Sequence, residues 1–206
     1  MTIANTLTFL RIFISPIFLF LYLEHEALYI SEALLPYFLL SLLCVSELSD
    51  ALDGYLARKY HQVTDFGKLL DPMADSIMRT SIFLAFTQPP VNIPLLLVFI
   101  FIYRDSVIAA LRTVCALRGF AMAASFAGKS KTAFQAIICI AIVILLIPHA
   151  SGALETSTLQ SISFILVAIA AFFTIYSGAE YLFVNRSYLR KLLHSNQQRD
   201  LSSGND

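Results

Sequence analysis

The sequence predicts an all-α membrane protein built as a six-transmembrane-helix bundle. Of the 206 residues, 58% are apolar and 14% are charged, whereas a soluble domain has about 25% charged residues. The apolar residues fall into six long stretches spread over the whole chain. No stretch alternates as a membrane β-strand does, and a segment in lipid must satisfy its own backbone hydrogen bonds. Each stretch is therefore predicted to be a helix.

The predicted helices cover roughly residues 7–23, 34–58, 67–87, 93–117, 130–148 and 159–190. A helix needs ~20 residues to cross a ~30 Å hydrocarbon core, and each stretch is about that long or longer. They form one integral membrane domain over residues 1–195. A short polar tail at residues 196–206 follows it.

The first stretch is predicted to start at Asn5 and Thr6. Side chains of these types accept hydrogen bonds from the free backbone N–H groups of a first helical turn. The stretch is longer than the apolar part of a signal peptide, and no Ala-x-Ala-like cleavage site follows it. Since similar segments come after it, we expect a retained first helix.

The second and third helices carry two pairs of aspartates. Asp50 and Asp53 are spaced i,i+3, and Asp71 and Asp75 are spaced i,i+4, so each pair lines one helix face. A short loop makes these helices antiparallel neighbours, which allows the faces to oppose each other. Four converging carboxylates need cations, and oxygen ligands suit Mg²⁺, Mn²⁺ or Ca²⁺ rather than zinc. A single aspartate of this kind could instead sit in water at a loop end.

Small residues accompany the aspartates. Gly54 and Ala57 share the side of the helix that carries Asp50 and Asp53, where a ligand or a neighbouring helix can approach the backbone. Packing alone can explain each small residue singly. Together the residues read Asp50-x2-Asp53-Gly54-x2-Ala57-Arg58-x8-Gly67-x3-Asp71-x3-Asp75.

This pattern resembles, at every fixed position, the signature of the CDP-alcohol phosphatidyltransferase family. The resemblance implies a six-helix membrane enzyme with a cytoplasm-facing polar active-site cavity. It implies one or two Mg²⁺ or Mn²⁺ ions bound by Asp50, Asp53, Asp71 and Asp75, with Asp75 also removing the proton of the acceptor alcohol. It further implies a homodimer. The residues expected to bind the CDP-lipid are Asn5, Thr8, Asp53, Gly54, Ala57, Arg58 and Gly67.

The acceptor alcohol is expected to bind at the fourth and fifth helices. A phosphorylated acceptor such as sn-glycerol 3-phosphate needs a cationic site, and the candidates are Arg104, Arg112, Arg118, Lys129 and Lys131. Alternatively, the last three of these anchor the chain at the cytoplasmic surface, and Arg104 forms a structural pair with Asp105. Serine, inositol phosphate or phosphatidylglycerol would be other acceptors for the same chemistry.

Three stretches resemble the branch of the family that uses CDP-diacylglycerol and glycerol 3-phosphate. They are Asn5-x-Leu7-Thr8-x-x-Arg11, Arg104-Asp105-x6-Arg112 and Gly128-Lys129-x-Lys131-Thr132-x-x-Gln135. The chain departs from that branch at Ala4, where proline is usual, and at Asp105, where glutamate is more common. It also has Ser76 where lysine usually follows the fourth aspartate. Arg79, one helical turn further on, is the candidate substitute.

Charge placement predicts the orientation. No Lys or Arg occurs in the connections at residues 24–33, 88–92 and 149–158. Basic residues gather in the connections at 58–68 and 118–131 and in the tail from 186. The positive-inside rule therefore predicts that both termini face the cytoplasm. We expect the host membrane to be the bacterial cytoplasmic (inner) membrane.

The same charges limit the partners. The 14 basic residues are balanced by 14 acidic ones, which disfavours a nucleic-acid partner and leaves membrane lipids and the two substrates. A cation or proton transporter also places carboxylates inside a bundle. Here the acids gather toward one side of the membrane and mark no path across it, which favours the enzyme.

Overall fold

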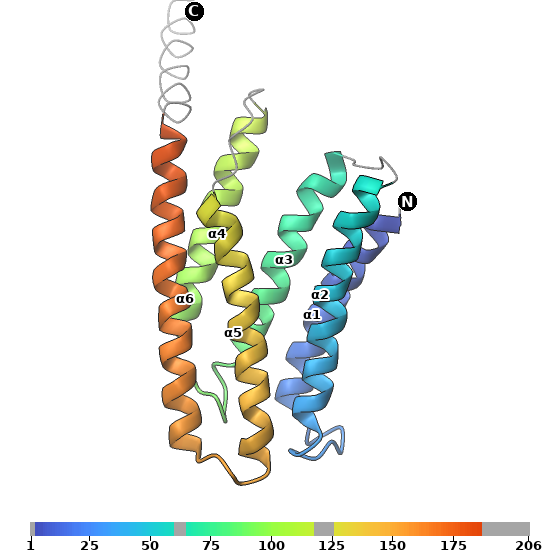
Figure 1. The fold of residues 1–206 in the computed structure, drawn as a ribbon, viewed down its shortest axis with the longest axis vertical. Coiled ribbons are helices and arrows are strands. Elements are labelled where there is room, and N and C mark those ends of the chain that lie inside the picture. The colour runs from blue at the N-terminus through green and yellow to red at the C-terminus, as the bar shows by residue number, and fades with distance from the viewer. Residues whose placement is uncertain (1–2, 60–64, 118–125, 187–206) are drawn as a thin grey trace, which may run out of the picture.

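The computed structural model describes residues 3–59, 65–117 and 126–186 and consists of six helices there (Figure 1). They are α1 (Ile3–Glu24), α2 (Leu35–Lys59), α3 (Asp65–Ala85), α4 (Leu95–Leu117), α5 (Phe126–Ala150) and α6 (Thr156–Val184). All six apolar stretches are helical, so the predicted all-α class is confirmed. The tail at 196–206 and the predicted end of the last helix beyond residue 186 lie outside the described residues.

The start of α1 differs from the sequence prediction. The helix begins at Ile3, so Asn5 and Thr6 lie inside its first turns and not ahead of it. No proline or glycine in this part of the chain stops the helix from extending toward the N-terminus. Pro72 lies inside α3, where it removes one helical N–H donor.

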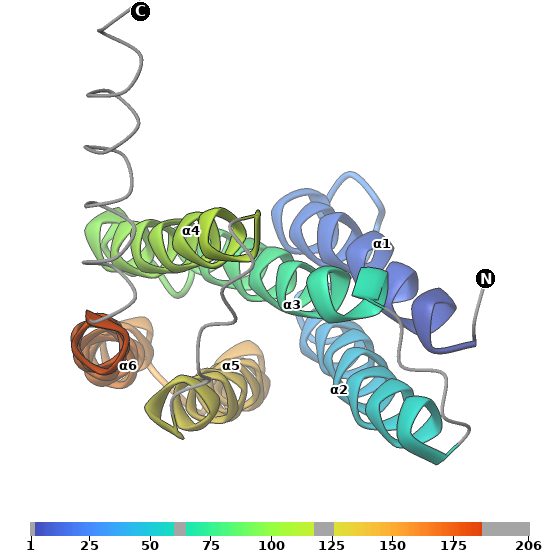
Figure 2. The ribbon, with the colours of Figure 1, turned by 90° about the horizontal axis from the view of Figure 1, so that it is seen from above.

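The helices form two groups. Viewed from above, α1, α2 and α3 lie together, and α4, α5 and α6 lie beside them (Figure 2). Helix α1 packs against α2 and α3, while α6 packs against α4 and α5. The groups meet where α3 contacts α4 and α5 and where α2 contacts α5. The start of α1 and the end of α6 lie at the same end of the bundle (Figure 1).

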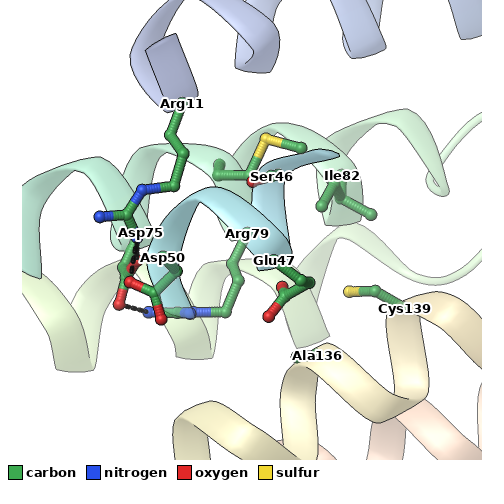
Figure 3. A pocket seen from close by; sticks show the side chains of 10 residues that line it. Arg11, Ser46, Glu47, Asp50, Asp75, Arg79, Ile82, Ala136 and Cys139 are labelled. Carbon is green, nitrogen blue, oxygen red and sulfur yellow. Dashed lines mark hydrogen bonds and ion pairs between the residues drawn. The ribbon is translucent and has the colours of Figure 1, made fainter. Parts of the chain in front are cut away.

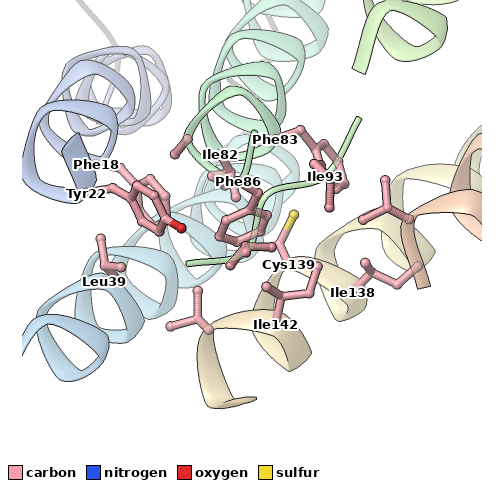
Figure 4. Packing of buried hydrophobic residues seen from close by; sticks show 14 of the residues in the cluster. Phe18, Tyr22, Leu39, Ile82, Phe83, Phe86, Ile93, Ile138, Cys139 and Ile142 are labelled. Carbon is pink, nitrogen blue, oxygen red and sulfur yellow. The ribbon is translucent and has the colours of Figure 1, made fainter. Parts of the chain in front are cut away.

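An apolar core joins the groups in the half of the bundle away from these two ends. Phe18 and Phe83 each pack edge-on against Phe86, with ring centroids 6.5 and 6.4 Å apart (Figure 4). Ile138 and Ile142 of α5 belong to the same buried cluster. The polar buried side chains of α1 and α2 lie nearer the other end, so the core supports a polar region above it. They are Thr8, Arg11, Ser15, Ser46, Ser49 and Asp53.

Four helices are long and apolar enough to cross a membrane: α1, α2, α5 and α6. The chain therefore has the composition of a membrane protein. Helices α3 and α4 miss that criterion because their sequences carry the charged residues considered below, among them Asp71, Asp75 and Arg79 in α3 and Arg104 and Asp105 in α4.

Candidate functional site

The four predicted aspartates surround one guanidinium group. Arg11 of α1 donates hydrogen bonds through Nη1 to the carboxylates of Asp50 and Asp75. Its Nη2 lies 2.6 Å from Asp53 Oδ2 and 4.0 Å from Asp71 Oδ1. The pairs from α2 and α3 therefore face each other, as their spacing predicts. The cation between them comes from a third helix.

Thr8 lies one turn before Arg11 on α1 and contacts the same cluster. Its hydroxyl donates to Asp71 Oδ1 at 2.7 Å and lies 3.4 Å from Asp53 Oδ2. It is 1% exposed. The expected role of Thr8 in binding the CDP-lipid stays a prediction, and the structure adds that its hydroxyl connects a carboxylate of α2 to one of α3. It thereby orients two of the proposed metal ligands.

Burial is graded across the cluster. The side chains of Arg11 and Asp53 are 1% and 6% exposed, so they form its floor. Asp50 and Asp71 are 49% and 46% exposed. The two most exposed carboxylates therefore belong to different helices, Asp50 to α2 and Asp71 to α3, and the buried Arg11 and Asp53 lie beneath them. A charged ligand can approach from that open side.

Arg11 is a site residue that sequence reasoning did not assign. The resemblance included it in a matching stretch, but nothing in one helix shows which charges of other helices it meets. The available signal was a charged residue within the first apolar run, one turn from Thr8 and on the same face.

The donor set suits a hard divalent cation. In residues 3–59, 65–117 and 126–186, no three Asp, Glu, His or Cys side chains are gathered in an arrangement that holds a metal ion. The Arg11 guanidinium instead lies between the aspartates. Four carboxylates that offer only oxygen atoms and already enclose a cation match the ligand preference of Mg²⁺ or Mn²⁺.

A small pocket adjoins the cluster and brings in two more charged residues. Arg79 Nη2 lies 3.5 Å from Asp75 Oδ2, an i,i+4 pair on α3. Glu47 of α2 lines the same pocket together with Arg11 and Asp50 (Figure 3). The family resemblance leads us to expect a lysine directly after Asp75, where this chain has Ser76. Arg79 contacts the Asp75 carboxylate in its place. Glu47 was not singled out from the sequence.

Two of the predicted acceptor-binding residues share one carboxylate. Arg104 Nη1 lies 3.1 Å from Asp105 Oδ1, and the Lys131 ammonium donates to the same oxygen. Arg104 also donates through Nη2 to Ser177 Oγ of α6 at 2.9 Å. The pair of Arg104 with Asp105 is thus present, and it extends to Lys131, which is 2% exposed.

Arg112 has a separate anchor on α6. Its Nε donates to the Tyr181 hydroxyl at 3.0 Å, and its guanidinium carbon lies 5.0 Å from the centre of that ring. A cation so placed is held by both a hydrogen bond and the face of an aromatic ring. The basic residues of α4 are therefore oriented by α6, a helix in which the sequence predicts no site residue.

Other predicted residues are only partly located. Arg118 lies outside the described residues. The helices contain Asn5 in α1, Gly54, Ala57 and Arg58 in α2, Gly67 in α3 and Lys129 in α5. The contacts of these six lie outside what the structure describes, and their roles stay predictions.

Comparison with known proteins gives a family and several relatives. Residues 1–176 match the family described as CDP-alcohol phosphatidyltransferase. A Bacillus subtilis protein named CDP-diacylglycerol–glycerol-3-phosphate 3-phosphatidyltransferase is 32% identical over 196 residues, covering 91% of this chain and 97% of its own. Proteins of the same name from Rickettsia typhi and Haemophilus influenzae are 31% and 32% identical. These alignments cover 90% and 89% of this chain and 98% and 92% of the relatives.

Proposed function

The chain belongs to the CDP-alcohol phosphatidyltransferase family, and on that premise we propose that it transfers the phosphatidyl group of CDP-diacylglycerol to sn-glycerol 3-phosphate. The products are phosphatidylglycerophosphate and CMP, in glycerophospholipid biosynthesis. The names of the relatives support both substrates. The observation that carries the proposal is the convergence of Asp50, Asp53, Asp71 and Asp75 around one cationic group.

The four aspartates are the residues that would hold one or two divalent cations, Mg²⁺ or Mn²⁺. When bound, such a cation neutralises charge on the pyrophosphate of the CDP-lipid. Thr8 orients Asp53 and Asp71 for this task through its two contacts. The outward-facing Asp50 and Asp71 form the side that the lipid pyrophosphate approaches.

Asp75 is proposed as the general base. It accepts the proton of the 1-hydroxyl group of glycerol 3-phosphate while that oxygen forms a bond to the phosphatidyl phosphorus. The bond from phosphorus to the CMP oxygen breaks, and CMP leaves with the electron pair. Arg79, one turn further along α3, holds the Asp75 carboxylate through Oδ2, so the orientation of the base is set before the acceptor arrives.

The phosphate of the acceptor is proposed to bind the basic residues of α4 and α5. Arg104, Arg112 and Lys131 are already oriented by Asp105 and by α6. Arg118 and Lys129 are proposed to complete the site. Several cations are needed because a phosphate monoester carries up to two negative charges. The planar guanidinium of arginine can bind two phosphate oxygens at once, whereas the lysine ammonium group acts as a single compact charge.

We also propose that all six helices lie in the bacterial inner membrane with both termini in the cytoplasm and that the enzyme is a homodimer. The bacterial relatives and the absence of Lys and Arg from the connections at 24–33, 88–92 and 149–158 support this location. Under this orientation the aspartates lie toward the cytoplasmic side, where a water-soluble acceptor meets a lipid phosphate.

The reaction is tested by following CMP release from CDP-diacylglycerol with Mg²⁺ and a panel of acceptors. Glycerol 3-phosphate should be preferred over serine, inositol, inositol phosphate and phosphatidylglycerol. Asp75→Asn should lower kcat by about a thousandfold, the scale expected for loss of a general base. The variant should keep the melting temperature of the wild type within a few degrees. Preference for another acceptor would reject the basic site, and an active Asp75→Asn enzyme would reject the base.

A further inference from the structure

Arg11 occupies the centre of the aspartate cluster but has no part in the transfer step. Its side chain is 1% exposed, and its Nη1 and Nη2 atoms make all of its ion pairs with the aspartates. Its buried Nε has no hydrogen-bond partner in the described part of the chain. Among the residues that the structure describes, the guanidinium is therefore held by the carboxylates alone.

The carboxylates in turn depend on the positive charge of Arg11, which offsets their mutual repulsion. Four carboxylates drawn to one place repel one another and stay ionised only when cations lie among them. An arginine keeps its charge at every pH at which proteins are studied, and its planar fork can bridge several carboxylates at once. Arg11 does so between two helices, since Asp50 and Asp53 lie on α2 and Asp71 and Asp75 lie on α3.

We infer that Arg11 is a positioning residue that holds the four aspartates together while no divalent cation is bound and leaves its place between them when the ion binds. The oxygen atoms of Asp50, Asp53 and Asp75 that engage Arg11 belong to the proposed metal ligands. A guanidinium and a metal ion cannot both occupy the space among these atoms, and their charges repel.

A small pocket adjoins the cluster on the side toward which the Arg11 side chain would move. Arg11 lines this pocket together with Ser46 and Glu47 (Figure 3). Glu47 supplies a further carboxylate in this pocket, which would attract the displaced guanidinium. The inference rests on the proposed function only in treating the aspartates as metal ligands.

The test measures Mn²⁺ binding by the electron paramagnetic resonance of free Mn²⁺, using the purified full chain in detergent after removal of metal with EDTA. Arg11→Gln should bind Mn²⁺ at least about tenfold tighter than the wild type, because the competing charge is gone. In EDTA its melting temperature should be lower than that of the wild type, and Mn²⁺ should raise it by more.

Two variants make the result specific. Arg11→Lys keeps the charge but replaces the fork with a single ammonium group, so its Mn²⁺ affinity should fall between those of the wild type and Arg11→Gln. It also serves if Arg11→Gln fails to fold. Arg186→Gln makes the same change of charge at an exposed arginine stacked on Phe183 of α6, and it should bind Mn²⁺ like the wild type.

The inference is overturned if folded Arg11→Gln or Arg11→Lys binds Mn²⁺ no tighter than the wild type, or if no form of the protein binds Mn²⁺. Weaker binding by these variants would mean that Arg11 supports the metal ligands and does not compete with the ion. CMP release by the wild type with glycerol 3-phosphate is measured separately. The wild type can therefore release CMP with glycerol 3-phosphate even if the Arg11 inference fails, so the two proposals are tested independently.

Discussion

The two oxygen atoms of the Asp75 carboxylate have different cationic partners. Oδ1 accepts a hydrogen bond from Arg11, and Oδ2 lies 3.5 Å from Arg79 Nη2. Arg79 is largely buried, with 15% of its side chain exposed, so its charge is screened less than that of a surface arginine. While no metal ion is bound, each oxygen of the proposed base is thus held by an arginine of a different helix, Arg11 of α1 and Arg79 of α3. Arg79 is the one that stays beside Asp75 when the ion binds.

Arg79→Gln should therefore lower kcat by about tenfold, a loss of about 1.4 kcal/mol in transition-state stabilisation. The Michaelis constant for CDP-diacylglycerol should change little, because Arg79 contacts Asp75 and none of the other three aspartates within ion-pair distance in the described structure. Steady-state kinetics with each substrate varied in turn measure both quantities.

A second substitution identifies the reason for the loss. Adding Ser76→Lys to Arg79→Gln restores a cation at the position where the family resemblance leads us to expect one. Recovery of kcat in the double variant would show that a positive charge beside Asp75 is what Arg79 supplies. An Arg79→Gln enzyme with the kcat of the wild type would contradict this role.

Among the helices, α6 orients the basic residues of α4. Ser177 binds Arg104 and Tyr181 binds Arg112, while Gly178 lies between these contacts on the same helix. A Cβ atom at Gly178 would lie 3.2 Å from Arg104 Cγ. Arg104 has little freedom to move aside because its guanidinium is also bound to Asp105. Because Gly178 has no side chain, Arg104 can lie across this face of α6.

Gly178→Ala should raise the Michaelis constant for glycerol 3-phosphate by about threefold to tenfold, because the added methyl group shifts Arg104. The helix itself should not suffer, since alanine favours a helix over glycine by about 1 kcal/mol. Kinetics at saturating CDP-diacylglycerol and a thermal melt distinguish these effects. Ala179→Val enlarges the next, exposed residue and should leave that Michaelis constant unchanged. Equal behaviour of the two variants would contradict the role of Gly178.

Over the whole molecule, the charges separate by end. The aspartate cluster lies toward the end of the bundle that carries the start of α1 and the end of α6 (Figure 1). The connections at the other end have no Lys or Arg. The zero net charge of the chain thus conceals a difference in charge between the two ends of the bundle, and this difference supports the proposed orientation in the membrane.

This orientation predicts a labelling pattern for cysteines placed at opposite ends. In a Cys44→Ala background the remaining Cys115 and Cys139 are buried. A membrane-impermeant maleimide applied to intact spheroplasts should modify Ala153→Cys but modify Lys59→Cys only after the membrane is permeabilised. Both positions are exposed at the surface of the chain, so accessibility differs only through the membrane. The reverse pattern would place the termini outside.

The sequence alone determined the helices and the residues that share a face of each helix, because hydropathy and the 3.6-residue period are local properties. The pairing of Asp50 with Asp53 and of Asp71 with Asp75 followed from spacing in this way. The proposal of a metal site therefore rests mainly on the spacing of these aspartates in the sequence.

Only the tertiary structure decided which faces of different helices meet. The rotation of α1 against α2 and α3 places Arg11 among the aspartates, and the packing of α6 on α4 places Ser177 and Tyr181 on two arginines. A helical period specifies the direction of a side chain around its own axis but not the partner that it faces, which is set by packing of all the helices at once. The contacts that orient the proposed site come from that packing.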